Sequence, residues 1–248
     1  MSGHSKWATT KHKKALIDSK RAKNFTKLLK EITVAAKMGD PNPDFNPRLR
    51  MAVDAAKKAS MPKQNIESAI KKATSSGVGE NWEEIRYEGY GSNGIAIIVE
   101  ALTDNRNRTA SSVRATFSKY GGNLGETGSV NFMFDKIGSI GYEGKVAKEE
   151  EMLDAAIEAG AENVESSEEW HEITTSVEDF ISVKDNLAKK FGESSEAAIL
   201  WKAKEPIVID DVEKAQKIQK LIEMLEDNED VQDVYSNFEV ADEIADKI

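Results

Sequence analysis

The chain has 248 residues, enough for two or three domains of roughly 100 residues, each able to bury a hydrophobic core. It has no cysteine, which excludes disulfides and thiol nucleophiles and fits a reducing compartment. Charged residues make up 31% of the chain, and the longest purely apolar run, Ile95 to Val99, has only five residues. No segment is therefore expected to span or bind a membrane, and we expect a cytoplasmic protein.

Charge is distributed unevenly along the chain. The net charge is −10, but residues 1–79 hold 17 Lys and Arg against 6 Asp and Glu, which gives +11. Residues 80–248 hold 17 against 38, which gives −21. A basic block joined to an acidic remainder is typical of a module that binds a polyanion, attached to domains that do not.

The basic block predicts three short amphipathic helices. In the first, the apolar side chains from Phe25 to Ala36 fall within about 60° of one direction, and lysines occupy the opposite face. The helix is expected to end at Gly39. Asn46 is expected to cap a second helix that begins at Pro47, and a third is expected to begin near Pro62. Together these helices would form a small bundle.

Beyond residue 80 the pattern changes from helical to strand-like. Strands are expected over 84–90 and 95–102 around a hairpin turn, then a helix over 107–120 and a strand over 130–134. From residue 136 to 204 the order is strand, helix, two strands, helix and strand, with the helices over 146–159 and 177–191. This order is the ferredoxin-like arrangement. A last helix over 212–226 and a strand over 231–238 are expected to complete the middle sheet.

The predicted fold class is α+β. A small helical bundle over residues 1–79 is followed by two α/β domains, of which at least one is ferredoxin-like. The first α/β domain combines residues 80–134 with 207–248. The second, acidic and ferredoxin-like, is inserted into the first at residues 135–206.

Candidate nucleic-acid contacts concentrate near the N-terminus. Residues 6–37 contain ten Lys and Arg and only two acids, Asp18 and Glu31. Each cation that neutralises a phosphate releases condensed counterions, so this segment is expected to bind nucleic acid with a steep salt dependence. The alternative is a solvated helix face, but such faces usually intersperse acids for i,i+4 pairs. The expected contacts are Lys6, Trp7, Lys11, His12, Lys13, Lys14, Lys20, Arg21, Lys23, Lys27 and Lys30.

Trp7, within this segment, has two interpretations, because it could stack on an exposed base or pin the tail to the bundle. A second basic cluster comprises Arg106, Arg108 and Arg114, and the first two lie where a strand is predicted to become a helix. Backbone N–H groups could hold an anion there. The alternative is a helix cap with local ion pairs to Asp104 and Glu100.

Catalytic and metal-binding patterns are lacking in the sequence. The three histidines fit no zinc motif, and the glycine-rich run Gly121–Gly125 follows a helix instead of opening one, unlike a dinucleotide-binding loop. The carboxylate clusters resemble solvated faces. We therefore expect no enzyme, cofactor or metal site. A further alternative is an interaction scaffold whose acidic domains bind a basic protein.

Several blocks of the sequence resemble the YebC/PmpR family. The resemblance covers most of the chain and is specific through about Phe134. The blocks that carry it are Met1-Ser2-Gly3-His4-Ser5-Lys6-Trp7, Asn46-Pro47-Arg48-Leu49-Arg50, Met61-Pro62-Lys63-Gln64-Asn65, Tyr87-Glu88-Gly89-Tyr90-Gly91, the run from Glu100 to Thr109, and Gly121-Gly122-Asn123-Leu124-Gly125.

The resemblance implies a helical N-terminal domain followed by two α/β domains, the third inserted into the second. It also implies a cytoplasmic bacterial protein or an organellar relative. Members of the family are described as DNA-binding transcriptional regulators. They are also described as ribosome-associated translation factors, including a mitochondrial translational activator and factors that relieve ribosome stalling. The basic segment is compatible with both roles.

Overall fold

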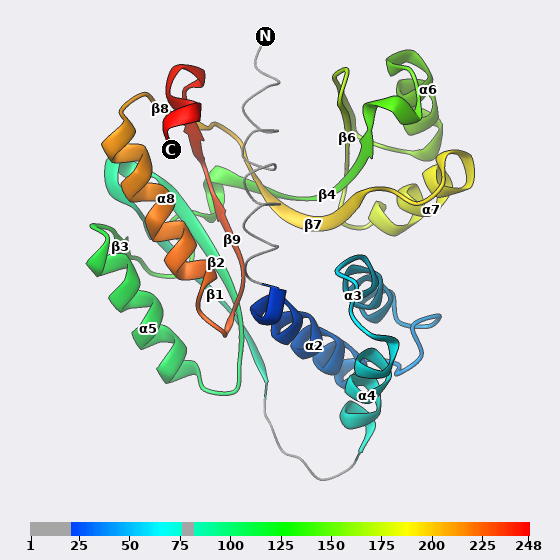
Figure 1. Cartoon of the computed structure of the whole chain (residues 1–248), viewed down its shortest axis with the longest axis horizontal. Helices are drawn as coiled ribbons and strands as arrows, with labels where there is room; N and C mark the ends of the chain where they lie inside the picture. The colour runs from blue at the N-terminus through cyan, green and yellow to red at the C-terminus, as the bar shows by residue number, and fades with distance from the viewer. Residues whose placement is uncertain (1–20, 76–81) are drawn as a thin grey trace. The chain divides into compact units, whose positions relative to one another are not determined.

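The structure is a computed structural model that describes residues 21–75, with side chains from Asn24 onward, and residues 82–248 (Figure 1). The described chain combines helices at the N-terminal side with two four-stranded antiparallel sheets and one short parallel pair, so the fold is α+β. It divides into two compact units. The first extends to Met133 and resumes at Glu205–Ile248, and the second is Phe134–Lys204.

Three helices open the described chain. They are α2 (Arg21–Met38), α3 (Pro47–Lys58) and α4 (Lys63–Thr74), and the sequence predicted all three. Their apolar faces meet in one core that includes Ile32, Leu49 and Ala56, all fully buried. Burial of these faces is the main source of stability in such short helices, because isolated helices of this length are marginal in water.

The first unit also contains a four-stranded antiparallel sheet. Its strands are β1 (Glu83–Tyr90), β2 (Ala96–Thr103), β3 (Asn123–Leu124) and β9 (Val231–Ser236), in the order β3-β1-β2-β9. The helices α5 (Arg106–Lys119) and α8 (Val212–Glu226) lie side by side on one face of this sheet (Figure 1). Two short parallel strands, β8 (Ile207–Ile209) and β10 (Phe238–Val240), form a separate pair that the sequence did not predict.

The strand predicted over 130–134 is wrong. Residues Asn131–Met133 form a 3-10 turn, and the next strand begins only at Phe134. The cause is the side chain of Glu88, whose Oε2 atom accepts the backbone N–H groups of Val130 and Asn131, each at 2.9 Å. These two N–H groups therefore bond to a buried side chain, and the segment turns instead of joining a sheet.

The second unit has the predicted ferredoxin-like order. Its elements are β4 (Phe134–Glu143), α6 (Glu149–Ala159), β5 (Asn163–Ser166), β6 (Trp170–Thr175), α7 (Phe180–Phe191) and β7 (Glu196–Ala203). The sheet order is β5-β6-β4-β7, and every neighbouring pair is antiparallel. Met152 of α6 and Phe180 of α7 are fully buried, as are Ile140 and Ile173 on the two central strands.

The described residues hold neither a candidate membrane span nor a metal-binding cluster. None of the described helices has both the length and the apolar character needed to cross a lipid bilayer. Within the same residues, no group of three or more His, Asp or Glu side chains is arranged to hold a metal ion.

Candidate nucleic-acid interface

The predicted nucleic-acid contacts fall into three groups in the structure. The first group lies outside the described residues and consists of Lys6, Trp7, Lys11, His12, Lys13, Lys14 and Lys20. Arg21 and Lys23 belong to the first turns of α2, and their side chains are outside the described part of the chain. Lys27, Lys30, Arg106 and Arg108 are described together with their surroundings.

Lys27 contacts the last residue of α8, and Lys30 contacts the loop between α8 and β9. The Nζ atom of Lys27 donates to the carbonyl oxygen of Glu226 at 2.8 Å, and that of Lys30 donates to the carbonyl oxygen of Glu229 at 2.8 Å. Lys30 also forms an ion pair with Oδ1 of Asp230 at 3.0 Å and lies 5.0 Å from the centre of the Trp82 ring. Only 13% of its side chain is exposed. In this structure Lys30 is therefore held by the protein itself.

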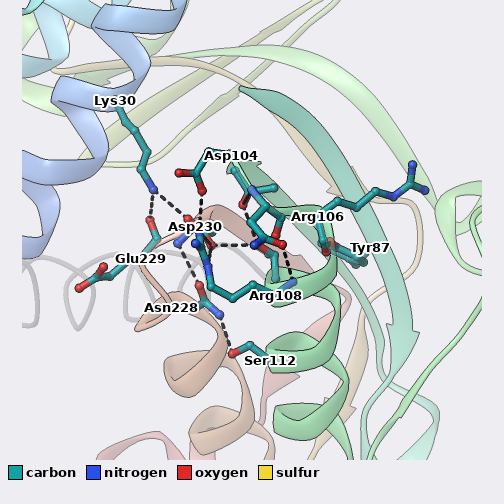
Figure 2. Close-up of polar contacts among 12 residues, drawn as sticks. Lys30, Tyr87, Asp104, Arg106, Arg108, Ser112, Asn228, Glu229 and Asp230 are labelled. Carbon is teal, nitrogen blue, oxygen red and sulfur yellow. Dashed lines mark hydrogen bonds and ion pairs between the residues drawn. The ribbon is translucent and has the colours of Figure 1, made fainter. Parts of the chain in front are cut away.

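Asp230 collects donors from two separate parts of the chain (Figure 2). Lys30 occupies Oδ1, whereas Oδ2 accepts from the Nη2 atom of Arg108 and the Oγ1 atom of Thr109, both at 2.8 Å. The aspartate side chain is 9% exposed. The structure thus brings together Lys30 and Arg108, which the sequence placed in different basic clusters.

The cations around Asp230 determine its protonation. Burial by itself would raise the pKa of this carboxyl group, but hydrogen bonds from Arg108, Lys30 and Thr109 outweigh burial and hold the pKa below its ordinary value. Asp230 therefore remains ionised at neutral pH. A buried carboxylate with this many donors is compensated, and its loss would leave the two cations without their shared partner.

The start of α5 is capped by a neutral side chain, and its Arg108 pairs with carboxylates of the chain. Asn105 caps the helix by accepting the N–H of Arg108 at 3.0 Å, and the guanidinium of Arg108 reaches Asp104 at 2.8 Å as well as Asp230. The predicted cap and the ion pair with Asp104 are present. Glu100, the other predicted partner, instead lies opposite Arg86 in the β1–β2 register. The amide oxygen of Asn105 thus takes a backbone N–H that the sequence offered to an anion, and two carboxylates neutralise Arg108.

Arg106 differs from Arg108 in its exposure. Its side chain is exposed and forms no ion pair among residues 24–75 and 82–248, while its carbonyl oxygen accepts the hydroxyl of Tyr87 at 3.4 Å. Figure 2 shows the Arg106 side chain extending away from Asp230. Arg106 and Arg108 belong to the same predicted basic cluster, but only Arg106 presents to solvent a guanidinium that has no carboxylate partner among the described residues.

The sequence did not identify Asp230, Thr109 or Asn228 as site residues. Asp230 belongs to the acidic run from Glu226 to Asp230, which has the composition of a solvated turn. Asn228 accepts the N–H of Asp230 at 2.9 Å and donates to Ser112 of α5 at 2.9 Å, so it fixes the turn that presents the carboxylate. The only available signal was an Asx turn, which Asn often forms with the residue two positions later.

The comparisons with known proteins cover nearly the whole chain. Residues 5–76 match the model of the TACO1/YebC protein N-terminal domain, and residues 82–238 match that of the TACO1/YebC second and third domain. A similar solved structure is that of a conserved hypothetical protein from Aquifex aeolicus. The two chains are 50% identical, with a TM-score of 0.82 over 92% of this chain and 94% of the other. The chain therefore belongs to the TACO1/YebC family, as the resemblance of its motifs predicted.

Proposed function

We propose that this protein is a non-enzymatic regulator of gene expression that binds nucleic acid through its basic N-terminal block. One observation carries the proposal: the net charge is +11 over residues 1–79 and −21 over the remainder. Membership of the TACO1/YebC family supports a regulatory role associated with nucleic acid in general. The specific role that we propose is that of a DNA-binding transcriptional regulator in the cytoplasm.

The contacts of the lysines in α2 refine which residues bind phosphate. We assign phosphate contact to the predicted cations before residue 24 and to the exposed Arg106. Lys27 and Lys30 act differently, because they bind the end of α8 and the loop after it and so position α2, while Arg108 binds Asp230 from α5. They would reach a phosphate only after leaving Asp230 and the loop carbonyls.

A second candidate is an RNA-binding translation factor that associates with ribosomes. The composition of the basic segment favours it, because eight of the nine Lys and Arg residues between positions 6 and 30 are lysines. Reading DNA bases usually needs Arg, Asn or Gln in the major groove, whereas lysine mainly contacts phosphates. Structured RNA can be recognised through shape and phosphates alone.

The salt dependence of binding tests the shared part of both candidates. We expect the full chain to bind short mixed-sequence duplex DNA or single-stranded RNA, with log K falling linearly against log salt concentration. Replacing Lys11, Lys13 and Lys14 by Ala should reduce that slope by roughly 0.7 to 0.9 for each phosphate that is no longer neutralised. A matched control is replacement of three lysines of the acidic second unit, Lys145, Lys189 and Lys190. Equal slopes for the two triple variants would refute the assignment.

Two experiments separate the candidates: footprinting on a promoter fragment, and sedimentation of ribosomes from cell lysate. A transcriptional regulator should protect a promoter fragment in a footprinting assay and stay out of the ribosomal fractions. A translation factor should co-sediment with ribosomes at low salt and leave them as salt is raised. Absence from the ribosomal fractions at low salt would count against the translation role, and uniform protection of unrelated DNA would count against the promoter role.

A further inference from the structure

We call residues 82–133 and 205–248, which contain the sheet β3-β1-β2-β9, the middle sheet region. Its lysines gather on α5 and α8, the two helices that cover the sheet. Residues 82–133 and 205–248 contain five lysines, and only Lys247 lies outside these helices. The other four are Lys119 at the end of α5 and Lys214, Lys217 and Lys220 on α8, and we call them the α5–α8 lysine patch. The region is otherwise acidic, so this gathering is a local reversal of charge.

The packing of α5 against α8 brings these lysines together. The helices run antiparallel, because Asn228 just beyond the end of α8 bonds Ser112 of α5 at 2.9 Å, while Lys217 lies beside Gly121 just after α5. A Cβ atom built on Gly121 would lie 3.0 Å from the Nζ atom of Lys217. Gly121 has a φ of +78°, which suits glycine, and its missing side chain leaves room for that ammonium group.

An aromatic side chain lies within the patch. The Nζ atom of Lys119 is 5.4 Å from the centre of the Tyr120 ring. Lys214 is three positions before Lys217, a spacing that makes two helical side chains neighbours. The patch therefore extends from Lys119 and Tyr120 at the end of α5, past Lys217 beside Gly121, and along α8.

Most of this positive charge has no partner among the described residues. Lys220 donates to Glu223 at 3.0 Å. Lys119, Lys214 and Lys217 are exposed and form no ion pair within residues 24–75 and 82–248. The second unit differs, because several of its lysines, including Lys202 and Lys204, do pair with acids. Glu213 directly precedes Lys214, but no acid lies between Lys214 and Lys220 along α8. Exposed lysines that gather in this way form a footprint for a polyanion.

We propose that the α5–α8 lysine patch is a second contact for the phosphodiester backbone of the nucleic acid that the basic N-terminal block binds. The inference rests on the proposed function and extends it to the middle sheet region. A nucleic-acid chain suits this role better than a small anion, because one polymer can reach two separate basic surfaces. The second contact is then intramolecular and strengthens binding without needing high affinity of its own.

Salt titrations of the full chain test the patch. The test variant replaces Lys119, Lys214 and Lys217 by Ala, and the control variant makes the same change at Lys145, Lys189 and Lys190. The probes are short mixed-sequence duplex DNA and single-stranded RNA. We expect the test variant to lower the slope of log K against log salt by about two to three units on duplex DNA, and by somewhat less on RNA. The control variant should keep the wild-type slope.

Each other outcome has a defined meaning. If the test and control variants have the same slope, the patch does not contact phosphates and the inference is wrong. If the variant lacking Lys11, Lys13 and Lys14 loses slope while the patch variant does not, the proposed function stands and only this inference fails. If the wild type binds neither probe, both fail. If polyglutamate competes as well as nucleic acid at equal charge, the patch recognises an acidic protein instead.

Discussion

The Nζ atom of Lys30 lies 3.0 Å from Oδ1 of Asp230, although 200 positions separate the two residues. Their side chains are 13% and 9% exposed, so the ion pair is largely shielded from water and from salt. Arg108 binds the other oxygen of the same carboxylate. One buried negative charge thus joins α2 to the start of α5 and to the turn before β9.

Replacing Asp230 by Asn should destabilise the first unit. The change removes the charge that Lys30 and Arg108 share and leaves two cations near each other, with an expected loss of about 1–3 kcal/mol. Urea denaturation measures the free energy of unfolding. Glu229→Gln is the matched control, because Glu229 is exposed and its carbonyl, not its carboxylate, binds Lys30. Equal stability of the two variants would show that the carboxylate contributes nothing.

The contribution of Asp230 to the free energy of unfolding should decrease at acidic pH only. Its folded pKa lies below the ordinary value of 3.8, so the folded state binds this proton less readily than the unfolded state does. The stabilisation is therefore complete above about pH 5 and is lost as pH falls through the lowered pKa. We expect the difference in unfolding free energy between wild type and Asp230→Asn to stay constant from about pH 7 to 5 and to shrink at lower pH. A change between pH 7 and 5 would contradict this origin.

Asn46 should contribute more than an ordinary helix cap. Its Oδ1 atom accepts the N–H of Leu49 at 3.0 Å, and its Nδ2 atom donates to the carbonyl oxygens of Ala35 and Asp40, each at 2.8 Å. Asn46→Ala should cost about 2–3 kcal/mol in unfolding free energy, because it removes the cap and leaves the buried Ala35 carbonyl without this partner.

A comparison with a simpler cap gives the control for Asn46. Asp211 caps α8 through one bond, to the N–H of Lys214 at 2.9 Å, so Asp211→Ala should cost only about 1 kcal/mol. Asn46→Asp keeps the acceptor and loses both donors, and it should fall close to Asn46→Ala. A wild-type unfolding free energy for Asn46→Asp would mean that the two hydrogen bonds donated by Asn46 do not contribute to stability.

Gly138 on β4 should not tolerate a side chain. A Cβ atom there would overlap the side chains of Thr175 and Phe180, both fully buried. Gly138→Ala should therefore destabilise the second unit by roughly 1–3 kcal/mol or more, seen as faster hydrogen exchange across β4, β6 and β7. The control is Gly91→Ala, where the nearest atoms lie at 3.4 Å and φ is −78°. Unchanged exchange in Gly138→Ala would contradict the crowding.

Most elements of the fold could be predicted from local patterns. The cap at Asn46 and the bounds of α8 depend on residues close together in the chain, and both match the structure. The helices α6 and α7 begin three residues later than predicted, at Glu149 and Phe180. Before α7, Ser176 and Asp179 bond each other in a turn that the apolar pattern does not reveal.

The surroundings of the candidate site could not be predicted in the same way. Helical periodicity shows that Lys30 points away from the apolar stripe of α2, but it does not show which element covers that direction. The covering loop lies 200 positions later and reads as a solvated acidic turn. The hydrogen bonds of Glu88 could not be predicted for the same reason, because the N–H groups that it accepts, those of Val130 and Asn131, are 42 and 43 positions away.

The ends of the second unit meet in the register of its own sheet. Phe134, its first residue, pairs with Ala203, one residue before its last. Antiparallel partners lie only about 5 Å apart, so the chain leaves the first unit and returns to it at nearly the same point. A bridge of a few residues from Met133 to Glu205 is enough to close the first unit without the second. The ferredoxin-like unit carries 17 acids against eight lysines and has its two ends close together, which is the arrangement that tolerates insertion of a whole domain.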